Sequence, residues 1–286
     1  MHKSNSGLNH QLATLQEIAL ESPDLPQMAA FYGAAFALDF RDDDHGLIGV
    51  APGRRLRLVP GERKRLRYAA FGVENDDTLR ALETRLENSA VSFQRIVSPG
   101  FSEGALSFTD PDGNCFIFGL PEAENGPPIS EVSTRAARLQ HVVVASTNIQ
   151  RAIDFHTRVT EFAISDIVLD SHGAARTAFL RCSRDHHSLA IFSASENRFD
   201  HFCFETSDWN GIRDWADHFA ARGVTIKWGP GRHGPGNNLF IFVHDPDGNW
   251  VEISAELEQI TSEKPVGQWP HEERTLNLWG AGLLRS

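Results

Sequence analysis

Two histidines and one glutamate in the second half of the chain have the residue types of a metal site. His141, His201 and Glu252 each lie within a stretch that has the apolar composition of a β-strand. Two imidazoles and one carboxylate on one face of a metal ion leave the opposite positions open, as in non-haem iron(II) oxygenases. A carboxylate within the apolar residues 250–253 is also costly to bury without a cation or another partner. The three residues together predict a mononuclear metal site.

An internal repeat supplies the elements that must position this trio. The sequence Asp-Pro-Asp-Gly-Asn at 110–114 recurs at 245–249, each time between two β-rich runs. In the second half, a strand pattern at 138–145 precedes a helical pattern at 149–159, and the same order returns at 201–206 and 209–222. Further β-rich runs, one of them at 225–228, follow each helix. The repeating unit is therefore predicted to be βαβββ, used four times.

These units predict an α+β fold with two domains of paired βαβββ modules. The first domain is expected at residues 10–122 and the second, which carries the trio, at 138–258. A polar segment rich in chain-breaking residues indicates a linker at 123–137. The aromatic final segment, 259–286, is expected to pack on the second domain.

The duplication separates residues needed for folding from residues needed for chemistry. The Asp-Pro-Asp-Gly-Asn turn is present in both copies, so it is interpreted as part of the fold. The trio is present in one copy only. Its equivalent positions in the first half are occupied by Glu17, Tyr68 and Ile117. If the strands curl around a shared hollow, the trio in the second half can meet at its centre.

Composition and charge narrow the classes of partner. The 286 residues carry a formal net charge of −11, which argues against nucleic acid and anionic membranes as partners. No stretch approaches the about 18 apolar residues of a membrane span. Three cysteines without a C-x-x-C pair and an N-terminus without an apolar leader favour a cytoplasmic protein.

The second half also resembles a known family in the spacing of one motif. From Gly231 to Glu252 the chain reads G-R-H, seven residues, I-F, two residues, D-P-D-G, three residues, E. This spacing resembles the type I extradiol dioxygenases, a group that includes enzymes of the catechol 2,3-dioxygenase and 2,3-dihydroxybiphenyl 1,2-dioxygenase type. They belong to the vicinal oxygen chelate (glyoxalase/bleomycin resistance/dioxygenase) superfamily. The resemblance covers about residues 12–258 and implies that each domain is a half-open barrel.

The resemblance implies a reaction and a set of roles. It implies ring cleavage of a catecholic substrate by dioxygen, next to the two hydroxyls, on iron(II), with manganese(II) as the alternative ion. His187 would act as acid/base beside the metal, and His233 would hydrogen-bond a substrate hydroxyl or orient the metal ligands. The family also implies assembly into a homo-oligomer.

The same resemblance predicts the residues of the substrate pocket. They are Val143, Phe179, Ala190, Asp200 and Phe242. One of them departs from the family, because Phe242 stands where the extradiol signature has tyrosine. The phenylalanine keeps the ring and loses the hydroxyl, so oxygen handling or substrate choice is expected to differ.

Two other functions fit the fold. One is a metal-dependent isomerase or lyase of the glyoxalase kind, which commonly uses a fourth protein ligand; no further carboxylate is in register here. The other is a binding protein of the bleomycin-resistance kind, which would not need the trio, His187 and His233 together. Oxygen uptake would separate the first from a dioxygenase, and tight binding without turnover would identify the second.

Overall fold

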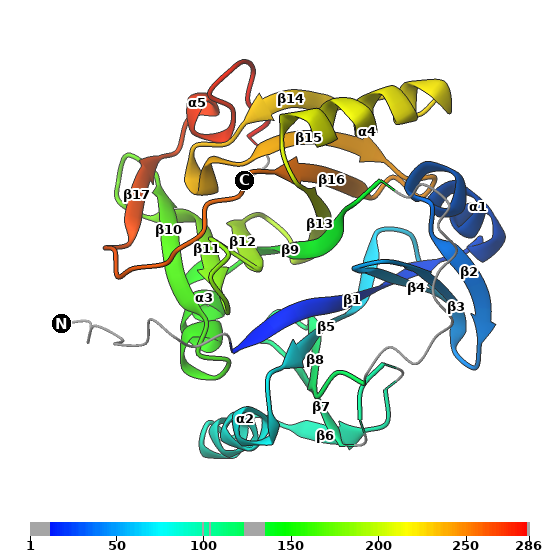
Figure 1. Cartoon of the computed structure of the whole chain (residues 1–286). Helices are drawn as coiled ribbons and strands as arrows, with labels where there is room; N and C mark the ends of the chain where they lie inside the picture. The colour runs from blue at the N-terminus through cyan, green and yellow to red at the C-terminus, as the bar shows by residue number, and fades with distance from the viewer. Residues whose placement is uncertain (1–11, 99, 103, 123–134, 285–286) are drawn as a thin grey trace.

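The computed structural model describes residues 12–98, 100–102, 104–122 and 135–284 (Figure 1). Most of the predicted linker, residues 123–134, lies outside the described part of the chain, and the predicted domain boundaries remain an interpretation of the sequence. Among the described residues, no helix combines the length and apolar character needed to cross a lipid bilayer.

The first half of the chain forms two βαβββ units, as the repeat predicts. The first unit contains β1 (Ala13–Ser22), α1 (Leu25–Phe36), β2 (Asp39–Asp43), β3 (Gly46–Ala51) and β4 (Arg54–Pro60). The second contains β5 (Arg65–Val73), α2 (Asp76–Asn88), β6 (Phe93–Ile96), β7 (Ala105–Thr109) and β8 (Cys115–Gly119).

The second half repeats the pattern and adds a C-terminal extension. Its first unit contains β9 (Arg138–Ser146), α3 (Ile149–Arg158), β10 (Ala163–Leu169), β11 (Ala175–Arg181) and β12 (Leu189–Ser193). Its second unit contains β13 (Arg198–Thr206), α4 (Trp209–Ala221), β14 (Trp228–Arg232), a short 3-10 turn (Pro235–Asn237), β15 (Leu239–His244) and β16 (Trp250–Ala255). The extension contains β17 (Gly267–Pro270) and α5 (Glu273–Leu276).

One predicted strand was misplaced. The run at 225–228 is not a strand, because the strand begins at its last residue and continues through the glycines to Arg232. Its pairing with β15 is interrupted between Trp228 and Gly231, so the strand is irregular. A strand rich in glycine and proline shows no alternation of apolar and polar side chains, so its position is hard to predict from the sequence.

The four long helices share one sequence device at their first turn. Each begins after an Asp or Asn whose side chain accepts a hydrogen bond from a backbone N–H three residues further on. These caps are Asp24, Asn75, Asn148 and Asp208. A side-chain oxygen at this position satisfies one of the N–H groups that a helix leaves unpaired, so the sequence fixes where each helix starts.

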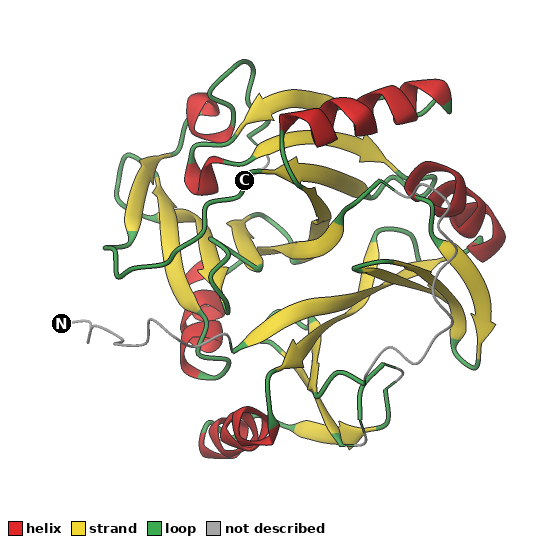
Figure 2. Ribbon diagram, in the orientation of Figure 1, coloured by secondary structure: helices red, strands yellow, loops and turns green. Residues whose placement is uncertain are grey.

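The strands form two curved sheets, one from each half (Figure 2). The first has the order β2-β3-β4-β1-β5-β8-β7-β6, and the second has the order β14-β15-β16-β13-β9-β12-β11-β10-β17. In each half the first strands of the two units, β1 with β5 and β9 with β13, pair antiparallel at the centre of the sheet. The second sheet gains one strand from the extension, because β17 pairs parallel with β10.

One apolar core joins the two halves. Phe36 of α1 packs against Phe204 of β13 and Trp215 of α4, with ring centroids 5.6 and 5.8 Å apart. Phe71 of β5 packs in the same way against Phe162 at 5.5 Å. On β9, Val142 and Val144 face this core, whereas Val143 belongs to a small separate cluster on the opposite face. The opposite face of the second sheet is therefore free to line a site.

The repeated turns are structural, as the duplication predicts. Asp110 and Asp245 each accept hydrogen bonds from the backbone N–H groups two and four residues further on. Each aspartate is also contacted by a helix of the other half: the Tyr32 hydroxyl donates to Asp245 at 2.8 Å, and His156 Nε2 lies 3.5 Å from Asp110. The turns thus end a strand and tie the two halves together.

Candidate metal centre

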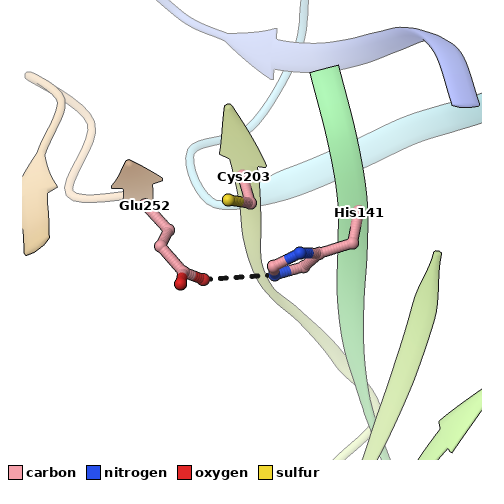
Figure 3. A group of neighbouring side chains, drawn as sticks. All are labelled: His141, Cys203 and Glu252. Atoms are coloured by element: carbon pink, nitrogen blue, oxygen red, sulfur yellow. Dashed lines mark ion pairs between the residues drawn. The ribbon is translucent and has the colours of Figure 1, made fainter. Parts of the chain in front are cut away.

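Three neighbouring strands bring the trio together. In the antiparallel pairing of β9 and β13, His141 lies opposite Cys203, and in the parallel pairing of β13 and β16, Cys203 lies beside Glu252. His201 is two residues before Cys203 on β13, so the alternation of side chains places both on the same face. Figure 3 shows His141 and Glu252 reaching toward each other from either side of Cys203.

The ligand atoms of the trio lie at distances that fit a single ion. Nε2 of His141 and Nε2 of His201 are 3.4 Å apart, and they lie 3.1 and 3.3 Å from the same oxygen, Oε2 of Glu252. Ligand atoms bound at about 2.1 Å and at right angles lie about 3 Å apart. The three atoms therefore have the spacing of one triangular face of a coordination octahedron.

Neighbouring acceptors fix how the two imidazoles are turned. Nδ1 of His201 lies 2.7 Å from Oδ1 of Asp200, and Nδ1 of His141 contacts Oε1 of Gln140. Since these oxygens accept, each Nδ1 carries the proton and each Nε2 presents its lone pair to the centre. Such partners orient metal-binding histidines and raise their basicity.

The protonation states suit metal binding. Burial lowers the pKa of His141, which favours the neutral imidazole. Burial alone would raise the pKa of Glu252, but the adjacent His141 and His201 hold it well below its usual value, so the carboxylate is ionised. Asn238 donates to the other carboxylate oxygen, Oε1, at 3.2 Å. An ionised, buried carboxylate beside the neutral imidazole of His141 gives a site that suits a cation.

Cys203 is a neighbour of the centre that the sequence analysis did not single out. A nitrogen of His141, the sulfur of Cys203 and a carboxylate oxygen of Glu252 lie within 4.8 Å of one another (Figure 3). The thiol is engaged elsewhere, because it donates to the Ser254 hydroxyl at 3.0 Å, and burial raises its pKa well above the usual value. The nitrogens and the carboxylate are therefore the better ligand set. The i, i+2 spacing from His201 is the sequence signal that could have found it.

A cavity opens from the trio, and it contains four of the five predicted pocket residues. Val143, Phe179, Ala190 and Phe242 line it, together with His187 and His233. Asp200 is not among the described lining residues, and its place in the substrate pocket stays a prediction. Its carboxylate is turned onto Nδ1 of His201, and its other oxygen lies 2.6 Å from the Arg198 guanidinium.

Several lining residues were not predicted. They are Thr177, Phe192, Trp228, Pro235, Asn238, His271, Leu276 and Leu283. Three of them, His271, Leu276 and Leu283, lie in the C-terminal extension beyond β17, so the final segment forms part of the cavity wall. Their spacing along the chain carries no signal, because they come from separate strands and loops that only the fold brings together.

His187 and His233 lie next to different members of the trio. The His187 ring lies 4.5 Å from that of His141, and burial lowers its pKa well below the usual value. Nε2 of His233 lies 3.8 Å from Oε1 of Glu252, and its Nδ1 donates to the backbone carbonyl of Leu276. Burial lowers the pKa of His233 to about 4. Both rings are neutral, so each presents a proton acceptor to the cavity.

The equivalent place in the first sheet holds an ionic cluster. The Tyr68 hydroxyl donates to Glu17, and Nε of Arg57 lies 3.0 Å from the same carboxylate. Ile117 lies beside Ala70, just as Glu252 lies beside Cys203. The register therefore agrees with the sequence comparison of the two halves.

Comparisons with known proteins identify the family of the chain. The family model described as "Glyoxalase/Bleomycin resistance protein/Dioxygenase superfamily" matches residues 138–253. Metapyrocatechase 2 of Cupriavidus necator is 30% identical over 298 residues, which cover 95% of this chain and 90% of that protein. The 3-methylcatechol 2,3-dioxygenase of Pseudomonas putida is 23% identical over 79% of this chain and 81% of that protein.

Solved structures show the same fold. Homoprotocatechuate 2,3-dioxygenase from Arthrobacter globiformis superposes with a TM-score of 0.83 at 21% identity, over 94% of this chain and 88% of that one. The Mn(II)-bound glyoxalase from Novosphingobium aromaticivorans superposes with a TM-score of 0.79 at 23% identity, over 96% of this chain and 93% of that one. The predicted α+β architecture is confirmed, and the chain belongs to the extradiol ring-cleaving dioxygenases of the glyoxalase/bleomycin resistance/dioxygenase superfamily.

Proposed function

We propose that the protein cleaves the ring of an uncharged catechol next to its two hydroxyls, using one iron(II) ion held by His141, His201 and Glu252. The observation that carries the proposal is the convergence of two imidazole nitrogens on one oxygen of a buried carboxylate, at 3.1 and 3.3 Å. When bound, the metal ion supplies the Lewis-acid and redox chemistry that joins a catechol to dioxygen. Both oxygen atoms enter the ring-opened product, so no reductant is consumed.

The protein's own residues position the substrate and move its protons. His233 donates through Nδ1 to a carbonyl, so its Nε2 accepts a hydrogen bond from a substrate hydroxyl. His187 lines the cavity beside His141 and is neutral, so it takes a proton from the substrate and returns it later in the reaction. Acid/base catalysis by a positioned group contributes ~10²–10⁴ in rate.

The cavity wall favours substrates without charge. The seventeen lining residues among the described part of the chain include no lysine and no arginine. The polar ones are either in the metal site or neutral, as with His271, whose pKa burial lowers. A carboxylate placed against this wall would lose its hydration without gaining a cationic partner. Phe179 and Phe192 instead offer apolar surface to an alkyl or aryl substituent.

Phe242 changes one contact of the reaction. Its ring packs edge-on against His201, with centroids 5.2 Å apart, and it lines the cavity without a hydroxyl. We expect Phe242→Tyr to place a hydroxyl near the substrate and to alter turnover more than substrate affinity.

The experiment that tests the proposal is oxygen uptake by protein reconstituted anaerobically with iron(II) and, in parallel, with manganese(II). Catechol and alkyl-substituted catechols are supplied while the visible spectrum is recorded. Stoichiometric oxygen uptake with a yellow ring-opened chromophore is expected with iron(II), and His201→Ala serves as the metal-free control. One equivalent of metal without uptake for any catechol would overturn the proposal in favour of a non-oxidative isomerase or lyase.

A further inference from the structure

A chain of polar side chains runs from the C-terminal extension to the cavity. Nε1 of Trp269 donates to Oδ2 of Asp166 at 2.7 Å, and the same oxygen lies 3.1 Å from Nε2 of His186. Nδ1 of His186 in turn lies 3.1 Å from Nδ1 of His187. His186 is fully buried and absent from the described cavity lining, so its only route to the reaction is through His187.

The order of donors along this chain follows from Asp166. A carboxylate only accepts, so Nε2 of a neutral His186 carries the proton, and its Nδ1 is the acceptor. Nδ1 of His187 must then donate to it. The second ring nitrogen of His187, Nε2, is left with a free lone pair. Among the described residues Nε2 of His186 makes no hydrogen bond of regular geometry, so this step rests on its 3.1 Å distance from the carboxylate and on the burial of both groups.

Asp166 is held in place by the extension. It lies opposite Gly267 in the pairing of β10 with β17. A Cβ atom on Gly267 would lie 2.2 Å from Oδ1 of Asp166, so only glycine lets the strand approach this closely. Burial alone would raise the pKa of Asp166, but the contacts with His186 and Trp269 and the charge of Lys264 together outweigh burial and lower it. The carboxylate is therefore ionised and fixed.

We propose that Asp166 and His186 are positioning residues that hold His187 in the tautomer whose bare Nε2 serves the substrate. The inference rests on the proposed acid/base role of His187. A histidine in the other tautomer would present an N–H where the reaction needs a base, as happens when the aspartate of a Ser-His-Asp triad is replaced. The aspartate here acts through a second imidazole, so Asp166, which lies outside the cavity lining, controls the proton acceptor.

The test uses the iron-loaded enzyme and a double-mutant cycle. Asp166→Asn should lower kcat by about 10- to 100-fold, within the contribution of an acid/base group, and leave KM and the metal content close to those of the parent. When His187 is already replaced by Phe, Asp166→Asn should lower kcat by less than about a further twofold. Its effect is transmitted through the imidazole of His187, which that variant lacks. Ser165→Ala, a buried change one position away on β10, is the matched control and should leave kcat unchanged.

A second pair of variants keeps the test informative if Asp166→Asn destabilises the fold. Asparagine at position 186 can place its side-chain carbonyl where Nδ1 of His186 lies, whereas leucine cannot. His186→Leu should therefore lower kcat as much as Asp166→Asn, and His186→Asn should restore most of it.

The outcomes distinguish this inference from the proposed function. If His187→Phe alone leaves kcat unchanged, the acid/base role of His187 is wrong. Suppose instead that His187→Phe lowers kcat, and that adding Asp166→Asn to this variant lowers kcat as many-fold as it does in the parent. The acid/base role of His187 would then stand, and the positioning role of Asp166 would be overturned. Equal activities of His186→Leu and His186→Asn would also overturn it.

Discussion

The carboxylate of Asp200 accepts a hydrogen bond from the imidazole of His201 at 2.7 Å, although the two residues are adjacent on one strand. Adjacent side chains on a regular strand point to opposite faces. The pairing of β13 with β9 shifts by one residue between Phe199 and His201, so Asp200 lies in a bulge. Bulges of this kind re-aim a side chain, and here the carboxylate reaches the ring beside it.

Removal of this carboxylate should weaken metal binding. Asp200→Ala takes away the acceptor that keeps Nε2 of His201 basic and correctly turned, and loss of such a partner costs roughly 10- to 100-fold in metal affinity. Asp200→Asn retains an acceptor and should lower the metal affinity by a smaller factor. Competitive titration with a chelator measures both, with Asp170→Asn in an exposed turn as the control. Equal affinities for parent and Asp200→Ala would refute the role.

Each member of the trio should be indispensable for metal. His141→Ala, His201→Ala and Glu252→Ala remove one of three ligands, so we expect metal content to fall from one equivalent to near zero. Elemental analysis after reconstitution measures it, and circular dichroism reports whether the fold persists. His172→Ala changes an exposed histidine and should keep full metal occupancy. A variant of the trio that retains one equivalent would exclude that residue as a ligand.

Charged catechols should be poor substrates. We expect kcat/KM for 3,4-dihydroxyphenylacetate to be at least about 100-fold below that for 3-methylcatechol, because the cavity offers its carboxylate no cation. Leu283→Arg introduces a cation into the cavity wall and should narrow the difference. Leu278→Arg introduces the same charge on the same segment outside the described lining and should not. Similar kcat/KM values for the two substrates in the parent enzyme would contradict the assignment.

The contact of α4 with α1 should make stability depend on pH. Nε2 of His218 donates to the Ala35 carbonyl at 3.0 Å, and burial, with the nearby Arg135 and Arg222, lowers its pKa from 6.5. The unfolded state therefore takes up the proton first as the pH falls below 6.5. The contribution of His218 to stability is present above that pH and is lost below it.

Melting temperatures at pH 7.5, 6.5 and 5.5 measure this dependence. His218→Gln keeps a donor and cannot titrate, so its melting temperature should fall less than that of the parent between pH 6.5 and 5.5. His172→Gln, an exposed change, should follow the parent. If the melting temperatures of His218→Gln and the parent fall equally with pH, His218 does not contribute to the pH dependence of stability.

The shared core should couple the two halves in unfolding. Phe36→Ala opens a cavity between α1, β13 and α4, so we expect a loss of about 3–5 kcal/mol in the free energy of unfolding. Phe36→Leu should lose less. Urea unfolding should remain a single transition followed equally by far-ultraviolet circular dichroism and tryptophan fluorescence. Two separate transitions in the parent would show that the halves fold independently.

The sequence by itself determined the scaffold and predicted which residues would bind a metal. Asp and Asn caps fix the starts of the long helices, and the twofold use of one unit exposes the histidines and the glutamate present in one copy only. His141, His201 and Glu252 could be identified because strand alternation and the repeat are local properties. Val143 and Phe179, which the family resemblance predicted for the pocket, line the cavity.

Only the tertiary structure decided how the site is supported. The contact of Asp200 with His201 could not be predicted, because the bulge arises from the pairing with β9 and leaves no mark in the composition of β13. Asp166 on β10 contacts His186 in the loop before β12, although the two residues are twenty positions apart in the sequence. The strand β17 pairs with β10 beside this contact. These contacts depend on the register of strands from distant parts of the chain, which local sequence patterns do not specify.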